Sequence, residues 1–348
     1  MEQNKYKLID VFSGCGGLST GFKKAGFEVL AGIDNCDKAL FTFEKNHRNS
    51  KSFNLDISKI TKNDFKDITG QIGDVDIVVG GPPCQGYSIA GKRIVEDTRN
   101  NLYKGFSEFL KYFTPKAFVM ENVPNLHAMG NGKIKERIIK EFQDIGYTVY
   151  SSILLASDYG VPQNRKRLFF IGYRDKCHYQ FPAPQILTPV ITSEEAIGDL
   201  PDVELDNGAE YPSPPLSKYQ SEMRKNSRGI YNHILTNHTE KTKRIISLVP
   251  DGGNYKDLPE ELRNTRKVNI AWTRLRSDKP SFTIDTGHRH HFHYKFNRIP
   301  TVRESARIQS FPDEFIFFGS KADQYAQVGN AVPPKLAFYL AKSIKEFL

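Results

Sequence analysis

Cys84 lies in a setting that suits a nucleophile. It follows the apolar, β-branched run Asp76-Ile77-Val78-Val79, two glycines that end this predicted strand, and the pair Pro82-Pro83. Because proline fixes φ and lacks a backbone donor, the turn is rigid, and the thiol is expected to face a cleft at a sheet edge. An isolated cysteine more often packs as a small hydrophobic side chain, but the glycine and polar neighbours of Cys84 favour catalysis.

A glycine-rich loop near the start of the chain predicts a cofactor site. Residues 6–12 have the pattern of a strand, Ser13-Gly14-Cys15-Gly16-Gly17 that of a turn, and residues 18–25 apolar positions at helical spacing. A second predicted strand, 27–33, ends at Asp34, where such folds place a carboxylate on a ribose hydroxyl. The pattern alone suits NAD, FAD or S-adenosylmethionine, since nothing in it requires a pyrophosphate.

Further motifs extend this pattern along the chain. In order, the sequence carries Asp10-Val11-Phe12-Ser13-Gly14-Cys15-Gly16-Gly17, Pro82-Pro83-Cys84-Gln85, Glu121-Asn122-Val123, Gln163-Asn164-Arg165-Lys166-Arg167, residues 303–312 and residues 327–334. Together they resemble the cytosine-C5 DNA methyltransferases of the bacterial restriction-modification type. The resemblance extends from Asp10 to Pro334, and chance agreement at so many ordered sites is negligible.

The resemblance implies a catalytic group of four residues, Cys84, Glu121, Arg165 and Arg167. Cytosine C5 is a poor nucleophile, so a thiolate must first add to C6 and push electron density into the ring. Cys84 would be this thiolate, and Glu121 the acid that acts on N3. A free thiol has a pKa of about 8.5, so a nearby cation would favour the thiolate, and Arg165 is the candidate. No side chain is assigned to remove the C5 proton, for which ordered water is expected.

Each of these charged residues has a simpler interpretation when it is taken alone. Glu121 would be a solvated carboxylate at a strand end, and either arginine a surface cation. Their joint occurrence with Cys84 favours the catalytic assignment.

The resemblance also implies S-adenosylmethionine as the cofactor and S-adenosylhomocysteine as the product. The residues expected to hold it come from the glycine loop, from the ends of other strands and from the last motif. They are Phe12, Ser13, Gly14, Gly16, Gly17, Leu18, Asp34, Asn35, Asp56, Ile57, Pro82, Leu102, Asn330, Ala331 and Val332. Asp56 also fits a plain strand end.

No metal is expected. The cysteines, Cys15, Cys36, Cys84 and Cys177, form no Cys-x-x-Cys pair, which also argues against a disulfide framework and fits a reducing compartment. A histidine cluster, His288, His290, His291 and His293, has no cysteine or carboxylate at the usual ligand spacing. Contact with a DNA groove or backbone is the favoured interpretation of these histidines.

The net charge of +9 is concentrated in one segment. Between Pro215 and Pro300 there are 17 Lys and Arg against 8 Asp and Glu, whereas the rest of the chain has 32 of each. A basic excess can mark only a solvated face, but beside a domain that acts on a base it predicts a surface for DNA phosphates. Thr283-Ile284 stands where the family often has a Thr-Leu pair. The residues expected to contact duplex DNA are Gln85, Ser88, Lys92, Arg93, Arg99, Arg274, Arg276, Thr283 and Arg289.

The order of patterns predicts an α/β fold with a Rossmann-like, doubly wound sheet and a smaller, irregular target-recognition domain. Strands are expected at 6–12, 27–33, 75–79, 117–121, 147–155 and 167–173, and helices at 18–25, 37–46, 101–113 and 133–145. The connection between the last two strands is too short for a helical crossover, which predicts an antiparallel terminal hairpin. The loop 88–99 would close over the substrate as a lid.

The expected domains are a catalytic domain, 1–190 with 318–348, and a recognition domain, 191–317. A proline-rich connection after Phe181 separates them, and the apolar, helix-forming stretch from Ala322 to Phe347 is expected to return to the catalytic domain. No run of eighteen apolar residues and no signal peptide is seen, so we expect a monomeric, cytoplasmic protein without membrane contact.

The predicted function is methyl transfer from S-adenosylmethionine to C5 of a flipped-out cytosine in a specific duplex DNA sequence. A cognate restriction endonuclease would act separately. The nearest alternative is an RNA (tRNA) cytosine-C5 methyltransferase, although the Cys-Phe-Thr signature of that relative is absent. A nicotinamide oxidoreductase would explain the glycine loop but not Cys84 with Glu121 and Arg165. A non-enzymatic DNA-binding regulator would not need the catalytic residues.

Overall fold

The computed structural model describes residues 5–83, 102–184, 190–263, 272–287 and 291–348. The chain forms two compact units. The first comprises Met1–Leu155, Lys166–Pro184 and Leu336–Leu348, and the second comprises Ala156–Arg165 and Gln185–Lys335. The second unit thus includes 156–165 and 318–335, which the sequence analysis placed in the catalytic domain. The assignment of the units to catalysis and target recognition stays a prediction.

The first unit is built on a seven-stranded sheet of order β3-β2-β1-β4-β5-β7-β6. The strands are β1 (Lys7–Val11), β2 (Glu28–Asp34), β3 (Lys51–Asn54), β4 (Ile77–Gly80), β5 (Ala117–Asn122), β6 (Thr148–Leu155) and β7 (Lys166–Tyr173). The pairs that join β1 to β5 are parallel, while β7 pairs antiparallel with both β5 and β6. The doubly wound sheet and its antiparallel terminal hairpin are therefore confirmed.

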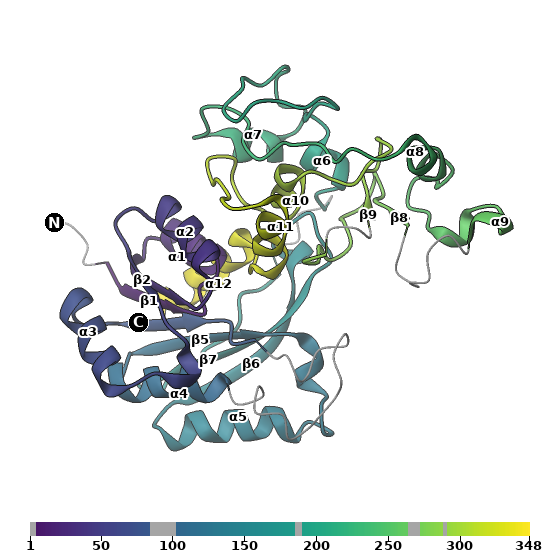
Figure 1. The fold of residues 1–348 in the computed structure, drawn as a ribbon. Helices are drawn as coiled ribbons and strands as arrows, with labels where there is room; N and C mark the ends of the chain where they lie inside the picture. Colours follow the sequence, from purple (N-terminus) through teal and green to yellow (C-terminus); the bar gives the residue numbers. More distant parts are fainter. Residues whose placement is uncertain (1–4, 84–101, 185–189, 264–271, 288–290) are drawn as a thin grey trace. The chain divides into compact units, whose positions relative to one another are not determined.

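Helices cover both faces of this sheet. They are α1 (Gly17–Lys24), α2 (Asp37–Asn46), α3 (Lys62–Ile72), α4 (Leu102–Phe113), α5 (Lys133–Asp144) and α12 (Pro334–Lys345). Figure 1 shows α1, α2 and α12 on one face and α3, α4 and α5 on the other. The last helix packs with this unit, as predicted: the Tyr173 hydroxyl donates to the carbonyl oxygen of Ile344 at 3.4 Å.

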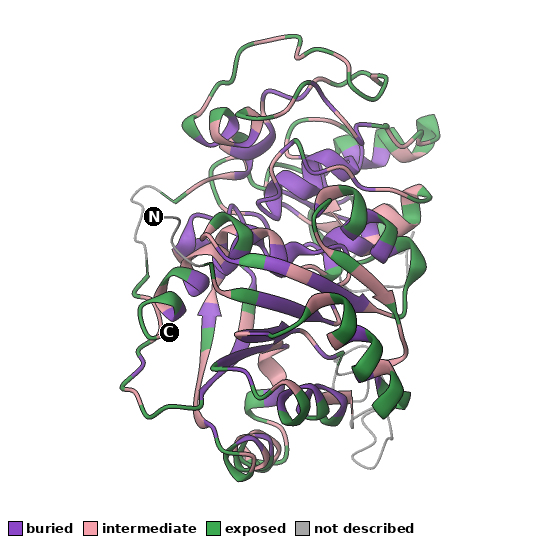
Figure 2. Ribbon diagram, turned by 90° about the vertical axis from the view of Figure 1, so that its left-hand side faces the viewer, coloured by how far each residue is buried: buried purple, intermediate pink, exposed green. Residues whose placement is uncertain are grey.

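One large part of the core of the first unit lies between the central strands and the helical layer formed by α3, α4 and α5. All four residues of β4 and the last four of β1 are buried (Figure 2). Phe106 of α4, Phe118 of β5 and Phe142 of α5 are fully buried and meet with ring centroids 4.6–6.2 Å apart. Burying three aromatic rings at this junction fixes the helices against the strands that carry the predicted catalytic residues.

Two elements of the first unit were missed by the sequence analysis. β3 is only Lys-Ser-Phe-Asn, with no apolar run, and it exists because it pairs in parallel with β2 at the sheet edge. α3 buries only Phe65 and Ile68 and begins with a capping box between Thr61 and Asp64. Short edge strands and helices with a narrow apolar face give weak periodicity.

The second unit is mostly irregular, with short helices. Its elements are α6 (Ser193–Ile197), α7 (Lys218–Arg224), α8 (Glu240–Ser247), α9 (Glu260–Arg263), α10 (Val302–Ile308), α11 (Lys321–Asn330), β8 (Thr273–Arg274) and β9 (His291–Phe292). One apolar cluster is centred on Ile246, Trp272 and Phe292. In the described ranges, no helix is long and apolar enough to cross a membrane.

Buried ion pairs organise the second unit around α10, which holds the first part of the motif 303–312. All seven residues of α10 are buried. Arg307 pairs with Asp199 at 2.5 Å and with Asp313 at 2.6 Å, and Arg298 pairs with Glu304 at 2.7 Å. Burial opposes ionisation of Glu304, but the Arg298 cation, which donates hydrogen bonds to both carboxylate oxygens, holds the pKa of Glu304 below its usual range. Removing one partner would leave a buried charge, so these pairs fix α10 in place. Arg307–Asp199 also ties α10 to a segment more than one hundred residues earlier in the chain.

Candidate active site

The strand order places the predicted site residues of the first unit at one edge of the sheet. From β1 the chain crosses first to β2 on one side and later to β4 on the other. Open α/β sheets bind ligands outside the carboxyl ends of the strands at such a switch point. The glycine loop follows β1, Asp34 ends β2, Pro82-Pro83 follow β4 and Glu121 lies near the end of β5.

The glycine loop needs its glycines for two different reasons. Gly14 and Gly16 have φ of +53° and +92°, a left-handed conformation that residues with a Cβ rarely adopt. A Cβ at Gly16 would also lie 2.6 Å from Nε2 of His47 and 2.8 Å from Cδ2 of Phe43. The backbone N–H of Gly14 donates to Oδ2 of Asp34 at 2.8 Å. The loop after β1 is therefore held by α2, by the His47 ring and by the end of β2.

The polar groups of this loop fit a cofactor with an amino acid end and a ribose. Oγ of Ser13 is buried and makes no hydrogen bond to the described residues. A buried hydroxyl without a partner is costly unless a ligand supplies one. Burial raises the pKa of Asp34, while the N–H groups of Gly14 and Cys36 oppose this rise by hydrogen bonding to its carboxylate. Donors and acceptors for both ends of the predicted cofactor are thus present at the ends of β1 and β2.

Three buried neighbours of the glycine loop, Asp10, Ser19 and His47, received no role in the sequence analysis. Oδ2 of Asp10 accepts a hydrogen bond from the Ser19 hydroxyl at 2.6 Å, and burial raises the Asp10 pKa to about 7. His47 stacks on Phe43 with ring centroids 4.5 Å apart, and burial lowers the His47 pKa to about 4. Of these three residues, only Asp10 could have been noticed in the sequence, because it lies inside the first motif. Ser19 and His47 carry no sequence signal.

Four other residues predicted to hold the cofactor have local structural partners or lie buried or at a helix end. Asp56 caps the short helix η1 (Ile57–Lys59): its Oδ1 accepts from the Ser58 N–H at 3.1 Å. Ile57 is buried, and a Cβ at Gly105 of α4 would lie 2.7 Å from its Cγ2. Leu102 begins α4 and Pro82 is buried. Their contact with the cofactor stays a prediction.

Glu121 and Arg167 form an ion pair across neighbouring strands. Oε1 of Glu121 lies 2.7 Å from Nε of Arg167, and the two side chains are 13% and 14% exposed. A Cβ at Gly81 would lie 3.1 Å from Oε2 of Glu121. The Asn122 amide donates to the carbonyl oxygen of Pro82 at 3.2 Å. The carboxylate therefore faces the start of the turn that leads to Cys84, and it is oriented by Arg167.

Several predicted residues lie outside the described ranges. They are Cys84, Gln85, Ser88, Lys92, Arg93, Arg99 and Arg289. Their roles, and the lid predicted at 88–99, stay predictions.

Arg165 lies in the second unit and differs from Arg167 in its surroundings. It is 1% exposed, and its guanidinium donates to the carbonyl oxygens of Ile284 at 3.0 Å and Gly329 at 2.8 Å. These contacts give Arg165 a role in holding the backbone together. Its predicted contact with the Cys84 thiol stays a prediction.

Arg165 belongs to a network that joins four motif segments of the second unit. The Ile284 N–H donates to Oε1 of Gln163 at 2.9 Å. The Gln309 amide donates to the carbonyl oxygens of Val328 at 3.1 Å and Ala331 at 2.8 Å. The same framework therefore holds the segment of Thr283 and the segment with Asn330, Ala331 and Val332. Whether these three residues contact the cofactor stays a prediction.

Arg274 was expected to contact DNA phosphates, and the structure contradicts this. The side chain is 4% exposed, and its guanidinium donates to the carbonyl oxygens of Ile246, Val249, His293 and Phe296 and to Oδ1 of Asn297. The donors are used internally, and burial lowers the Arg274 pKa. A sequence cannot distinguish such an arginine from a surface cation. Arg276 is half exposed and forms two hydrogen bonds with Asp278, at 2.9 and 3.0 Å.

The histidine cluster is represented by His291 and His293 in the described residues. His293 is fully buried, its Nδ1 accepts from the N–H groups of Lys295 and Phe296, and burial lowers its pKa to about 4. Within the described ranges, no group of three or more His, Cys, Asp or Glu is arranged to hold a metal ion. His293 is a neutral core residue and does not face DNA, contrary to the sequence-based interpretation.

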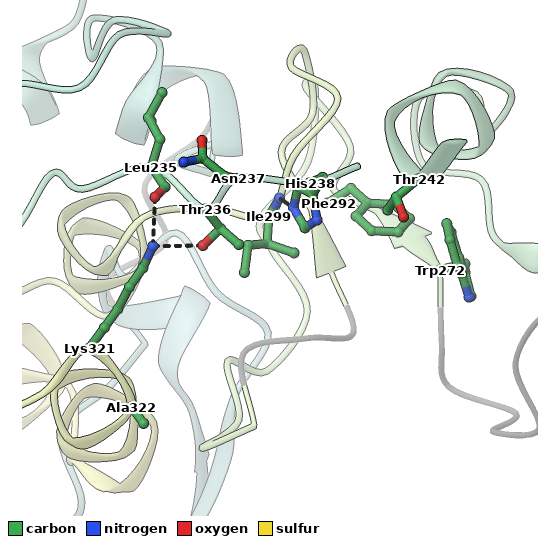
Figure 3. A pocket seen from close by; sticks show the side chains of 10 residues that line it. All are labelled: Leu235, Thr236, Asn237, His238, Thr242, Trp272, Phe292, Ile299, Lys321 and Ala322. Carbon is green, nitrogen blue, oxygen red and sulfur yellow. Dashed lines mark hydrogen bonds between the residues drawn. The ribbon is translucent and has the colours of Figure 1, made fainter. Parts of the chain in front are cut away.

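A pocket of about 500 Å³ in the second unit is lined by residues that the sequence analysis did not single out (Figure 3). Trp272, Phe292 and Ile299 contribute apolar surface. The Lys321 ammonium donates to the carbonyl oxygen of Leu235 at 2.8 Å and to the Thr236 hydroxyl at 2.7 Å. Lys321 thereby ties α11 to the segment before α8, and we assign no ligand to the pocket.

Comparison with known proteins places this arrangement in a family. A model of the family described as C-5 cytosine-specific DNA methylase matches residues 6–346. The type II methyltransferase M.DdeI of Desulfomicrobium norvegicum is 40% identical, over 97% of this chain and 88% of the relative. The type II methyltransferase M1.HphI of Haemophilus parahaemolyticus is 39% identical, over 97% and 86%.

Solved structures of methyltransferases have the same fold as this chain. An E. coli prophage protein described as a DNA modification methyltransferase has a TM-score of 0.81 at 26% identity, covering 98% of this chain and 99% of its own. The S. pombe Dnmt2 methyltransferase, with a TM-score of 0.61, 17% identity and 99% coverage of both chains, shares the fold. The chain belongs to the C-5 cytosine-specific DNA methylases, S-adenosylmethionine-dependent enzymes that transfer a methyl group to C5 of cytosine in DNA.

Proposed function

We propose that this enzyme is the modification methyltransferase of a type II restriction-modification system. It acts on a flipped-out cytosine in a specific duplex sequence, through a covalent bond between Cys84 and C6. The observation that carries the chemistry is the Glu121–Arg167 pair, which faces the turn before Cys84. The type II assignment is supported by the names of relatives that align over nearly the whole chain.

The chemistry divides between three side chains of the first unit. The Cys84 thiolate adds to C6, and negative charge develops on the ring. Glu121 hydrogen bonds or donates a proton to N3, which withdraws that charge. Arg167 fixes the carboxyl group of Glu121, because its Nε is 2.7 Å from Oε1. C5 is then nucleophilic enough to take a methyl group, and after transfer the C5 proton leaves to water as the bond to Cys84 breaks.

The cofactor supplies the electrophilic methyl group when it is bound. The residues at the ends of β1 and β2 are suited to hold it. Ser13 offers a buried hydroxyl, the glycine turn holds the left-handed conformation of Gly14 and Gly16, and Asp34 offers carboxylate oxygens for a ribose. Asn35, Asp56, Ile57, Pro82 and Leu102 complete the proposed site in the first unit.

The second unit is the proposed DNA-reading part, which acts on double-stranded DNA while the enzyme is a monomer. The basic excess between Pro215 and Pro300 supports this proposal. Base flipping requires a few kcal/mol of unstacking, which protein contacts around the extruded nucleotide must offset. A separate restriction endonuclease would cleave the same sequence when it is unmethylated.

The direct test compares substrates. The protein is incubated with S-adenosylmethionine and either genomic duplex DNA or tRNA, and 5-methylcytosine is mapped by bisulfite sequencing. We expect methylation at one short duplex sequence and none in tRNA. Equal or better methylation of tRNA would favour the RNA alternative, and methylation of duplex cytosines without sequence preference would remove the restriction-modification assignment.

A further inference from the structure

The segment 281–284 of the second unit is held rigidly from both of its ends. The Ser281 N–H donates to the carbonyl oxygen of Pro162 at 2.9 Å, and its own carbonyl oxygen accepts from the Asn164 N–H at 2.8 Å. The Thr283 hydroxyl donates to the carbonyl oxygen of Asn164 at 3.1 Å. The Ile284 N–H is bound by Gln163. The backbone of this segment is therefore fixed before any ligand arrives.

Phe282 projects from this fixed backbone towards solvent. Ser281 and Ile284 are 0% and 5% exposed, whereas Phe282 is 41% exposed. One side of its ring stacks on His291 of β9, with centroids 5.5 Å apart and planes inclined by 25°. The stack orients the ring and leaves part of it accessible. A rigidly presented aromatic ring loses little conformational entropy when it binds.

The ligand that this enzyme must contact offers flat aromatic surfaces. Its substrate is DNA, and a base that leaves the duplex exposes the faces of the bases that it was stacked on. Proteins that distort DNA insert apolar side chains such as Phe between base steps, and a base on an aromatic ring is a favourable stack without sequence preference. Thr283, the predicted DNA contact, is the next residue along the chain.

We propose that Phe282, supported by His291, is a stacking wedge that contacts a base face exposed when the target cytosine flips out. This assignment rests on the proposed role of the second unit in binding duplex DNA. It makes Phe282 a positioning residue, because it stabilises the flipped state without touching the reacting atoms.

The test uses three substitutions of Phe282 and a matched control. Phe282→Ala removes the ring, Phe282→Leu keeps apolar contact with His291 but has no aromatic face, and Phe282→Tyr restores the ring. Phe41 of α2 is similarly exposed, at 45%, so Phe41→Ala controls for loss of a surface phenyl group. Binding is measured with a cognate duplex that carries 2-aminopurine beside the target cytosine.

We expect Phe282→Ala and Phe282→Leu to weaken cognate binding by roughly 5- to 150-fold and to raise the 2-aminopurine fluorescence in the complex. Phe282→Tyr should restore both, and Phe41→Ala should behave as the wild type. Because Phe282 is uncharged, the slope of log K against log salt should not change in any variant. The thermal midpoint of Phe282→Leu checks that the unit is still folded.

The outcomes separate this inference from the proposed function. If the wild type binds and methylates cognate duplex DNA but Phe282→Leu and Phe282→Ala match it in affinity and fluorescence, the wedge is wrong and the proposed function stands. If the wild type itself shows no preference for cognate over random duplex, the proposed role of the second unit fails. Loss of affinity in Phe282→Tyr as large as in Phe282→Ala would also overturn the wedge, because the ring is present.

Discussion

At the scale of single residues, the paired arginines of one motif have different surroundings. Arg167 of β7 pairs with Glu121 across the sheet, while Arg165 is buried in the second unit and binds two carbonyl oxygens. The sequence places them two positions apart, and the sequence analysis chose Arg165 as the cation beside Cys84 and gave Arg167 no separate role. The division follows from their backbone positions: Arg167 lies within the hairpin strand, and Arg165 precedes it.

Substitutions of Glu121 and Arg167 are predicted to slow methylation to different extents. Glu121→Gln should slow single-turnover methylation by ~10²–10⁴-fold, since general acid catalysis typically contributes this much. Arg167→Ala should slow it as well, because the carboxyl group loses its anchor, and Arg167→Lys should be intermediate. S-adenosylmethionine affinity, measured by calorimetry, serves as the control and should be unchanged. An unaltered rate in Glu121→Gln would exclude Glu121 from the chemistry.

Arg274 and Arg276 form a natural matched pair for separating structure from DNA contact. Arg274→Met leaves several buried carbonyl oxygens without donors, which should lower the free energy of unfolding by about 2–5 kcal/mol. Arg276→Met should leave the unfolding transition nearly unchanged and should flatten the salt dependence of DNA binding by about one unit. Denaturant unfolding and binding at several salt concentrations measure the two effects. If Arg274→Met were stable and flattened the slope of log K for DNA binding against log salt, Arg274 would after all be a phosphate contact.

At the scale of elements, the loop after β1 depends on the end of α2. His47 follows α2, stacks on Phe43 and leaves no space for a Cβ at Gly16. Its pKa is about 4 in the folded protein against 6.5 for an unperturbed histidine. Between these values the unfolded state binds more protons, so the contribution of neutral His47 to stability is complete above pH 6.5 and is lost as the pH falls towards 4.

This linkage predicts how a substitution behaves with pH. His47→Gln should destabilise the protein most at pH 7, and the difference from the wild type should shrink by about 2–3 kcal/mol on going to pH 4. Comparing the two proteins cancels the opposite contribution of Asp10, whose raised pKa makes its carboxyl bind protons more tightly in the folded state. Urea unfolding across this pH range is the measurement. A difference that is constant with pH would mean that the pKa of His47 is the same in the folded and unfolded states, and a difference that grows as the pH falls would mean that His47 is charged in the folded protein.

The strands that bear the first unit's site were predictable because they are apolar runs bounded by glycine, proline or a charged residue. β1, β2, β4 and β5 are found within one or two residues of their predicted positions. Glu121 and Asp34 could be placed because strand ends in a parallel sheet converge. The tertiary network of Gln163, Arg165 and Gln309 was not predictable, since its partners are backbone carbonyls far along the chain.

At the scale of the whole molecule, the two units divide the chain differently from the sequence-based boundaries. The ion pairs Arg307–Asp199 and Arg298–Glu304 join residues on either side of position 300. Both pairs lie inside Gln185–Lys335, the longer of the two segments that form the second unit. An exchange meant to transfer target specificity should therefore replace this whole segment, so that both partners of each ion pair come from the same protein.

We predict that replacing 185–335 by the equivalent region of M.DdeI transfers the target sequence and keeps methylation activity. In an exchange limited to 191–300, one residue of each ion pair comes from M.DdeI and the other from this protein. We expect this smaller chimaera to be less stable. Methylation mapping and thermal unfolding distinguish the two chimaeras. If the larger chimaera is active but keeps the original target, the second unit does not choose the sequence.

The central claim is that Cys84 attacks C6 of a cytosine held beside the Glu121–Arg167 pair. The most direct test incubates the protein with S-adenosylmethionine and cognate duplex DNA that carries 5-fluorocytosine at the target, because fluorine at C5 cannot leave as a proton does. We predict a covalent complex that survives denaturation, and a peptide map that places the adduct on Cys84. Cys84→Ser should bind DNA and cofactor but form no complex. A stable complex formed by Cys84→Ser, or an adduct on another residue, would contradict the account.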